Sequence, residues 1–253
     1  MKLSFVIPAW NEEKYLGQAL ESVLRETKKH PEEIEVIVVN NKSTDKTREI
    51  ALSFPEIKLV DEPIKGLPQA RQAGFLASKG KLVANMDADS VLPFGWIEKV
   101  FQEFSKNEKL VALSGPYYYY DLPKYYNFFV KLYYFPGYIF HLFNHHILKK
   151  GAMLQGGNFV LRRSALEKVG GFNLDIKFYG EDTDIARRIQ KTGKVKFDFS
   201  FTMATSARRL KKEGLLKTAG NYVINYFWVI IFKKPFTQNY AYVGDYSTKK
   251  IKK

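Results

Sequence analysis

The sequence predicts an α/β protein whose central sheet is mainly parallel and is covered by helices on both faces. Short apolar runs alternate with amphipathic segments of helical period from residue 3 to residue 104. Most of these runs are continuously apolar, which is typical of strands buried on both sides. The composition, 45% hydrophobic and 26% charged over 253 residues, is that of a globular protein large enough to bury a sizeable core.

The first part of the chain is expected to form four strands, each followed by a helix. The strands are predicted at 3–8, 35–39, 57–60 and 81–86, and the helices at 11–24, 43–54, 66–78 and 93–104. Asn11 is the candidate N-cap of the first helix. In the fourth helix the apolar side chains between Trp96 and Phe104 share one face, as expected for a helix packed on a sheet.

The amino-acid composition of the chain changes after residue 115. Residues 117–150 are strongly aromatic, with lysines among the rings. The later elements are expected to be a strand at 156–163, helices at 164–170 and 180–193, one alternating strand at 195–203, and an apolar helix or strand at 221–232. The last of these is too short to span a bilayer. We therefore divide the chain into three expected parts, 1–115, 116–207 and 208–253.

The charge balance is basic and cysteine is absent. Forty Lys and Arg against 26 Asp and Glu give a formal charge of +14, which favours nucleotides, phosphates, nucleic acid or an acidic membrane surface as partners. The lack of Cys excludes disulfides and thiolate metal sites. The N-terminal run reaches Pro8 too early for a signal peptide, so we expect a cytoplasmic protein.

Polar clusters follow three of the predicted strands. They are Pro8 to Glu12, Asn40-Asn41 and Asp87-Ala88-Asp89. Open α/β sheets bind ligands beyond the carboxyl ends of their strands, so these clusters are expected to meet at one rim. The two carboxylates of Asp87 and Asp89 can hold Mg²⁺ or Mn²⁺ together with waters and a diphosphate. Taken alone, the motif is more typical of an exposed turn that caps the next helix, because short motifs often match by chance.

A second acidic cluster, "GEDTD", opens the predicted helix at 180–193. Glu181, Asp182 or Asp184 can act as a general base towards a substrate hydroxyl. Acids also favour a helix N-terminus without any function, and Asp184 with Arg188 forms a possible i,i+4 pair. The cluster alone does not decide between these interpretations.

Taken together, these motifs resemble a known enzyme family. The order "FVIPAWNEE", "EVIVVNNKSTD", "GLPQARQAG", "LVANMDADS", "GGNFVLRR" and "GEDTDIARR" is similar to that of the family 2 inverting glycosyltransferases, over about residues 1 to 205. The resemblance implies the GT-A fold, a Rossmann-like sheet that binds a nucleotide-sugar, with a smaller acceptor-side lobe and here a C-terminal aromatic segment. Residues 1–115 would then bind the donor and 116–207 the acceptor. Residues 208–253 lie beyond the resemblance and are expected to form a helical segment and a basic tail, whose aromatic and basic residues suit a membrane surface.

The resemblance also implies roles for individual residues. On the donor side, Trp10 would lie near the nucleotide base, and the other residues of that site would be Pro8, Ala9, Glu12, Asn40, Arg71, Asp87 and Ala88. Asp89 would be the usual metal ligand, with Asp87 as the first carboxylate that contacts ribose or metal. The family commonly has Asp where this chain has Asn40, which leaves the nucleotide, UDP or GDP type, open.

For the reaction, the resemblance implies inverting transfer of a single sugar to an acceptor hydroxyl on a glycan or lipid-linked glycan, with Mn²⁺ or Mg²⁺ as cofactor. Asp182 matches the acceptor-activating base, and Glu181 and Asp184 are its neighbours. Gly156-Gly157-Asn158 lies where sugar and acceptor sites meet. The Gln-x-x-Arg-Trp pattern of processive polymer synthases is absent from this region, which favours single addition.

Other interpretations of the sequence stay open. The basic and aromatic residues are compatible with a nucleic-acid-binding protein, the paired carboxylates with a nucleotidyltransferase, and Asn40 with a catalytically inactive scaffold. The aromatic segments 117–150 and 221–232 suit the cytoplasmic membrane face, and equally an acceptor lobe, a core or a homodimer contact. His141, His145 and His146 have no acids nearby in sequence, so they are expected in a pocket, an interface or the surface rather than at a metal.

Overall fold

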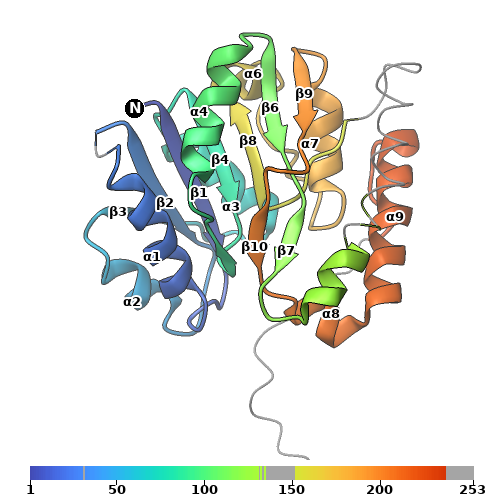
Figure 1. Ribbon diagram of the computed structural model, residues 1–253, viewed down its shortest axis with the longest axis horizontal. Coiled ribbons are helices and arrows are strands. Elements are labelled where there is room, and N and C mark those ends of the chain that lie inside the picture. The colour runs from blue at the N-terminus through green and yellow to red at the C-terminus, as the bar shows by residue number, and fades with distance from the viewer. Residues whose placement is uncertain (31, 131, 133, 135–151, 238–253) are drawn as a thin grey trace, which may run out of the picture.

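The computed structural model describes residues 1–30, 32–130, 132, 134 and 152–237, and its centre is a seven-stranded sheet in the order β3-β2-β1-β4-β8-β6-β9 (Figure 1). The strands are β1 Leu3–Ala9, β2 Ile34–Asn40, β3 Ile57–Asp61, β4 Leu82–Met86, β6 Leu110–Ser114, β8 Asn158–Arg162 and β9 Lys194–Phe197. Strand β8 runs antiparallel to its neighbours β4 and β6, and the other pairs are parallel. The prediction of a mainly parallel sheet is confirmed.

Helices cover both faces of this sheet, as predicted. One face carries α1 Leu16–Thr27, α2 Thr47–Leu52 and α4 Trp96–Lys106, and the other carries α3 Leu67–Ala77, α6 Arg163–Lys168 and α7 Glu181–Ile189. Alternate residues of β1 enter the two cores, since Phe5 and Ile7 lie in the first and Val6 lies in the second. The strand is therefore apolar on both sides, which explains its unbroken hydrophobic run.

A small second sheet lies beside the carboxyl ends of the main strands. Its order is β5-β10-β7, with β5 Ser90–Val91, β7 Tyr117–Tyr119 and β10 Met203–Thr205. Directly after β10 come α8 Arg208–Glu213 and α9 Leu215–Phe232, and α9 packs against α7 and α8. This arrangement brings the start of α8 next to the loop between β4 and β5 (Figure 1).

Three local expectations differ from the structure. Asn11 does not cap α1, which begins at Leu16; its backbone is left-handed (φ 55°), a conformation that Asn tolerates, and its Oδ1 accepts a hydrogen bond from Thr44 N. The expected strand at 195–203 is two strands in different sheets, because Asp198 organises a turn between β9 and β10. Strand β6 was not expected, although "LVALS" is an apolar run.

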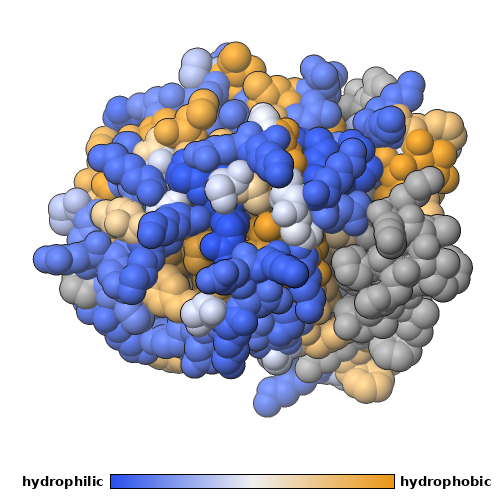
Figure 2. Space-filling view, turned by 90° about the horizontal axis from the view of Figure 1, so that it is seen from above, coloured by the Kyte–Doolittle hydropathy of each residue, from blue (hydrophilic) through white to orange (hydrophobic). Residues whose placement is uncertain are grey.

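The apolar segment at 221–232 is helical and belongs to α9. Several of its large apolar side chains are exposed, among them Phe227 and Ile231. Figure 2 views the molecule from the end opposite the carboxyl ends of the parallel strands; there hydrophobic residues gather at the edge where Figure 1 places α9. None of the helices in the described ranges has the length and apolar character needed to cross a membrane. The three histidines at 141, 145 and 146 and the Lys-rich end lie outside the described residues.

Close packing of α3 on the sheet predicts the effect of adding one methyl group. A Cβ at Gly74 would overlap Val6 Cγ1 and lie 3.1 Å from Val39 Cγ2. We expect Gly74→Ala to lower the free energy of unfolding by about 1–2 kcal/mol, because overpacking outweighs the gain in helix propensity. The matched control is Gly220→Ala in α9, where a Cβ meets no described atom within 4 Å. Urea unfolding should show the loss for the first variant, and an equal response of both variants would contradict this packing.

Candidate active site

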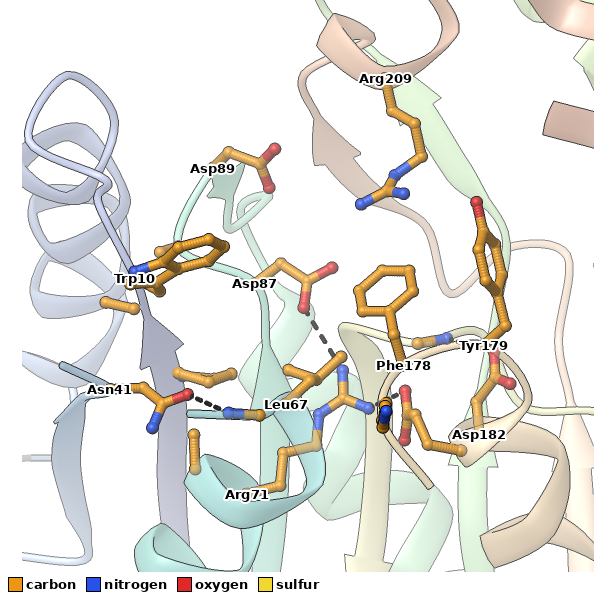
Figure 3. Close-up of a pocket in the computed structure, with 18 of the residues that line it drawn as sticks. Trp10, Asn41, Leu67, Arg71, Asp87, Asp89, Phe178, Tyr179, Asp182 and Arg209 are labelled. Carbon is orange, nitrogen blue, oxygen red and sulfur yellow. Dashed lines mark hydrogen bonds and ion pairs between the residues drawn. The ribbon is translucent and has the colours of Figure 1, made fainter. Parts of the chain in front are cut away.

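A cavity of about 690 Å³ lies at the carboxyl ends of β1 and β4. The strand order reverses between these neighbours, which is where open α/β sheets bind ligands. Most of the predicted site residues line this cavity: Pro8, Ala9, Trp10 and Glu12 after β1, Arg71 on α3, Asp87, Ala88 and Asp89 after β4, and Glu181 and Asp182 on α7. Asn40 and Asp184 do not line it. Figure 3 shows Trp10, Asp87 and Asp182 around the same space.

The reversed direction of β8 brings a glycine loop to this rim. Asn158 pairs with Met86, so the residues before β8 lie beside those that follow β4. Gly157 has φ +77°, and a Cβ at this position would overlap the carboxylate of Asp87. Only glycine combines this backbone conformation with so close an approach. The loop therefore forms one wall of the cavity next to Asp87.

Arg71 links the two acidic motifs. Its side chain is 1% exposed, and its guanidinium donates to the Glu181 carboxylate and to Asp87 Oδ1, 3.4 Å away. Burial lowers the pKa of Arg71, but the neighbouring carboxylates of Glu181 and Asp87 raise it further, so the net shift is upward. Tyr117 holds the other oxygen of Asp87, donating from its hydroxyl at 2.8 Å. Arg71 was predicted to bind the nucleotide, which stays a prediction; in the structure its guanidinium fixes two carboxylates at the cavity.

Asp182 stands at the start of α7 and faces the cavity (Figure 3). Its Oδ1 accepts a hydrogen bond from Thr183 N at 2.7 Å, and its Oδ2 accepts one from Gly156 N at 3.2 Å. Burial raises the pKa of Asp182, although these amides oppose the shift. Two backbone donors thus hold one carboxylate at the edge of an open space, which is a suitable position for a general base.

Glu181 and Asp184 differ from Asp182 in their surroundings. Glu181 is engaged by Arg71, and burial raises its pKa to about 7 despite that arginine. Asp184 is not among the residues that line the cavity. It pairs with Arg188 at 2.7 Å and with Arg187 at 2.8 Å, so the predicted i,i+4 pair is confirmed.

The opposite side of the cavity is built from the ends of β1 and β2. Trp10 lies there, with the ammonium of Lys65 3.2 Å from the centre of its ring. Asn41 supports this side by binding the loop after β3: its Oδ1 accepts from Gly66 N at 2.8 Å, and its Nδ2 donates to Ile64 O at 2.7 Å. Figure 3 shows Asn41 and Trp10 on the same side of the space.

Asn40 was predicted to belong to the donor site, but it does not line the cavity. Its Nδ2 donates to Asp61 Oδ1 at 2.7 Å, and its Oδ1 accepts from Ser43 N at 3.3 Å. Asp61 is held in turn by Arg48. Asn41 lines the cavity instead. Consecutive residues at the end of a strand point to opposite sides, so a shift of one position moves a side chain from the cavity to the other face.

Asp89 is paired with an arginine that the sequence did not indicate. Arg208 Nε lies 2.8 Å from Asp89 Oδ2, and the two terminal nitrogens of the same guanidinium donate to the two oxygens of Glu12. Burial raises the pKa of Glu12 to about 7, and Arg208 opposes this shift. The carboxylates of Glu12 and Asp89 therefore share one cation on the cavity wall.

The carboxylates also allow a test of the divalent metal implied by the motif. Asp87 and Asp89 both line the cavity and offer hard oxygen ligands. Among the residues that the structure describes, no cluster of three or more acidic or histidine side chains has the arrangement to hold a metal ion. Mg²⁺ and Mn²⁺ sites are often completed by phosphate oxygens and water, so the pair fits a cation that arrives with a diphosphate.

Comparison with known proteins identifies the family. The model of glycosyl transferase family 2 matches residues 4–170, well over half of the chain. The chain belongs to glycosyl transferase family 2. A second model, described as the N-terminal domain of galactosyltransferase, matches residues 140–211. The predicted family membership is thus confirmed.

Relatives of this family 2 chain carry glycosyltransferase names. It is 35% identical to the dolichyl-phosphate beta-glucosyltransferase ALG5A of Trichomonas vaginalis over 126 residues, which are 45% of this chain and 39% of that protein. It is 30% identical to the probable glycosyltransferase YdaM of Bacillus subtilis over 214 residues, 76% of this chain and 47% of that protein. The chain thus spans less than half the length of these relatives.

A solved structure confirms the GT-A fold. The mannosyltransferase PcManGT from Pyrobaculum calidifontis, in complex with GDP-Man and Mn²⁺, is similar with a TM-score of 0.62 and 18% sequence identity. The match covers 85% of this chain and 62% of that one.

Several residues of the site were not found from the sequence. They include Lys65, Tyr117, Tyr179, Arg208, Arg209 and Tyr222, which all line the cavity. The adjacent arginines 208 and 209, placed directly after an alternating segment in a chain with two acidic motifs, were a signal that was not used. Of the others, Tyr117 belongs to β7 of the second sheet, Lys65 and Tyr179 lie on the loops before α3 and α7, and Tyr222 lies on α9. They come from four separate segments, so no local pattern marks them.

The raised pKa values predict how stability depends on pH. Glu181 loses its proton near 4.5 when unfolded and near 7 when folded, and the pKa of Glu12 is raised in the same direction. Between these pH values the folded state holds more protons, so the free energy of unfolding should fall as the pH rises from 4.5 to 7. In urea unfolding, the free energy of unfolding of Glu181→Gln should fall less with pH than that of the wild type. The exposed control Glu49→Gln should show the same fall as the wild type. A stability that rises over this interval would contradict the assignment.

Proposed function

We propose that this protein is a metal-dependent inverting glycosyltransferase that moves one sugar from a nucleoside-diphosphate sugar, of the UDP or GDP type, to an acceptor hydroxyl. The observation that carries the proposal is that Asp182, Asp87 and Asp89 line one cavity together with Trp10. A base for the acceptor and carboxylates for the diphosphate side therefore face the same space. PcManGT, which shares the fold, binds GDP-Man and Mn²⁺.

The donor would lie between the ends of β1 and β4. Trp10, with Pro8 and Ala9 beside it, offers a flat apolar surface to a nucleotide base. Asn41 rather than Asn40 provides the polar side chain on this wall. The cavity volume of about 690 Å³ is suitable for a ligand of nucleotide-sugar size.

Asp87 and Asp89 would hold Mn²⁺ or Mg²⁺ next to the diphosphate. The bound cation would neutralise the charge that develops on the departing nucleoside diphosphate. Arg71 and Tyr117 keep Asp87 at the cavity edge, since each donates to a different oxygen of its carboxylate. With these contacts in place, 34% of the Asp87 side chain remains exposed, so its carboxylate can contact a ligand.

Transfer would proceed as one displacement at the anomeric carbon. The acceptor oxygen forms the new bond to that carbon, the bond from carbon to the phosphate oxygen breaks, and the nucleoside diphosphate leaves with the electron pair. Asp182 takes the proton of the acceptor hydroxyl. Thr183 N and Gly156 N orient its carboxylate for this step. Attack from the side opposite the leaving group inverts the configuration.

The acceptor is proposed to be a glycan or a lipid-linked glycan. The middle part of the chain, 116–207, would supply its site, and α9 would bring the protein to the cytoplasmic membrane face or to a second copy. Exposed aromatic and aliphatic side chains on α9, among them Ile224, Phe227 and Ile231, support such a contact. The relative ALG5A is named for a dolichyl-phosphate acceptor, which attacks with an already ionised oxygen. Whether a base is needed therefore separates the two acceptor classes.

Replacing the proposed base gives a direct test. Asp182→Asn should lower kcat by about a hundredfold to ten-thousandfold, because the acceptor hydroxyl keeps its proton. The rise in melting temperature on adding the nucleoside diphosphate should persist, since the donor site is intact. The readout is release of nucleoside diphosphate with a candidate acceptor.

The matched control is Asp175→Asn, an exposed acid on the rim of the same cavity. It should keep most of the activity. Wild-type turnover by Asp182→Asn would remove Asp182 from the base role and would favour an acceptor that is already ionised, such as a lipid phosphate.

A thermal-shift panel tests the metal and the donor class. UDP, GDP, dTDP and CDP are added with and without Mn²⁺, and one nucleotide should raise the melting temperature mainly when Mn²⁺ is present. Asp89→Asn should lose the part of the shift that depends on Mn²⁺, because one carboxylate ligand is gone. An absence of any shift in the wild type would contradict the proposed function.

A further inference from the structure

Arg208 occupies the carboxylates that the proposed metal needs. Its guanidinium lies between Glu12 and Asp89, with Nε 2.8 Å from Asp89 Oδ2 and Nη1 2.8 Å from Glu12 Oε2. The three side chains are largely enclosed, with 20% of Arg208, 11% of Glu12 and 12% of Asp89 exposed. This is a charge-assisted bidentate contact in a place of low solvent access, where such contacts are strong.

The backbone fixes Arg208 at this position. Ser206 N donates to Asp89 O at 3.2 Å, which joins the end of β10 to the metal motif itself. Ala207 N donates to Asp121 Oδ1 at 2.7 Å, and Lys211 pairs with the same carboxylate at 3.0 Å. The start of α8 is therefore attached on both sides, and the guanidinium can leave Asp89 by rotating its own side chain without moving the helix.

A divalent cation at Asp89 has to compete with this guanidinium. Asp89 Oδ2 is taken by Arg208, and Oδ1 accepts from Thr205 Oγ1 at 3.4 Å. The fixed positive charge also repels a second cation at a separation of a few ångströms. Within the ranges that the structure describes, no third acidic or histidine ligand completes a metal site. The protein alone is therefore a poor binder of Mn²⁺.

The same arginine is placed to meet a diphosphate. Arg208 and Arg209 both line the cavity, and a guanidinium matches two phosphate oxygens as well as it matches a carboxylate. An incoming diphosphate offers Arg208 a new anion and offers the cation additional oxygen ligands. The exchange keeps every charge paired, which matters in a largely buried place.

We propose that Arg208 keeps Asp89 and Glu12 closed to divalent cations until a diphosphate enters the cavity, and that its guanidinium then turns from Asp89 to the diphosphate. The inference rests on the proposed function for the nature of the ligand. It assigns Arg208 a role that neither acidic motif has: it makes metal binding depend on the donor.

Mn²⁺ binding without any nucleotide tests the first half. Titration of the protein with Mn²⁺, followed by the electron paramagnetic resonance signal of the free ion, should show weak binding by the wild type. Arg208→Gln should bind about tenfold to a hundredfold more tightly, because the cation no longer displaces a charged hydrogen bond. Arg209→Gln removes the same charge from the next residue and should change the affinity by about threefold or less. Equal Mn²⁺ affinities of the wild type and Arg208→Gln would overturn the proposal.

Glu12→Gln controls for a general loosening of this contact in Arg208→Gln. It keeps Arg208, leaves Asp89 as its only carboxylate partner here and removes one negative charge, so Mn²⁺ affinity without nucleotide should not exceed that of the wild type. An affinity of Glu12→Gln as high as that of Arg208→Gln would show that the guanidinium does not exclude the cation and would overturn the gating role. Circular dichroism checks that each variant is folded.

The second half is tested by repeating the titration with the nucleoside diphosphate that gives the largest thermal shift. Mn²⁺ affinity of the wild type should rise towards that of Arg208→Gln, so the gap between the two proteins should shrink. If the nucleotide leaves the difference in Mn²⁺ affinity between the two proteins unchanged, Arg208 does not move from Asp89 to the diphosphate, and the proposal is overturned. If the proposed function is wrong, no nucleotide gives a thermal shift in the wild type, and this result is distinct from equal Mn²⁺ affinities in the first titration.

Discussion

The buried guanidinium of Arg71 is the contact on which the rest of the site depends. It reaches Asp87 at the end of β4 and Glu181 at the start of α7, two positions that the chain brings together from 16 and 110 residues away. Each acid would be costly to bury without a partner, and Arg71 would be equally costly without them. The three groups therefore stabilise one another only when α3, β4 and α7 are all in place. The relative position of the two acidic motifs follows from this contact.

A second arginine does the same on the other side of the cavity. Arg208 neutralises Glu12 after β1 and Asp89 after β4, as Arg71 neutralises Asp87 and Glu181. Pairing with the two arginines thus allows acidic side chains to be gathered at the strand ends. Both arginines line the cavity, but they differ in exposure, with 1% of the Arg71 side chain and 20% of the Arg208 side chain exposed.

The direction of β8 is the topological feature that brings Asp182 and Asp87 to the same side of the cavity. Because β8 runs against its neighbours, the loop before it reaches the rim where β4 ends. That loop carries Gly157, which lies next to Asp87. It also carries Gly156, whose N–H donates a hydrogen bond to Asp182. A parallel strand at this place would have left the loop at the far end of the sheet. The base candidate and the metal motif share one cavity for this reason.

The sequence alone was sufficient for the fold class, for most strand and helix positions, and for nearly every acid of the site, but Trp10 is the one cavity aromatic that it marked. Strands buried on both faces are unbroken apolar runs, helices show their period, and polar clusters at strand ends stand out against both. It was not sufficient for the break between β9 and β10, for the choice of Asn41 over Asn40, or for Arg208, which lies 196 residues from Glu12. These depend on strand direction and on contacts between distant segments. A local pattern reports how a residue relates to its neighbours in the chain, whereas the order of strands in the sheet decides which distant side chains meet.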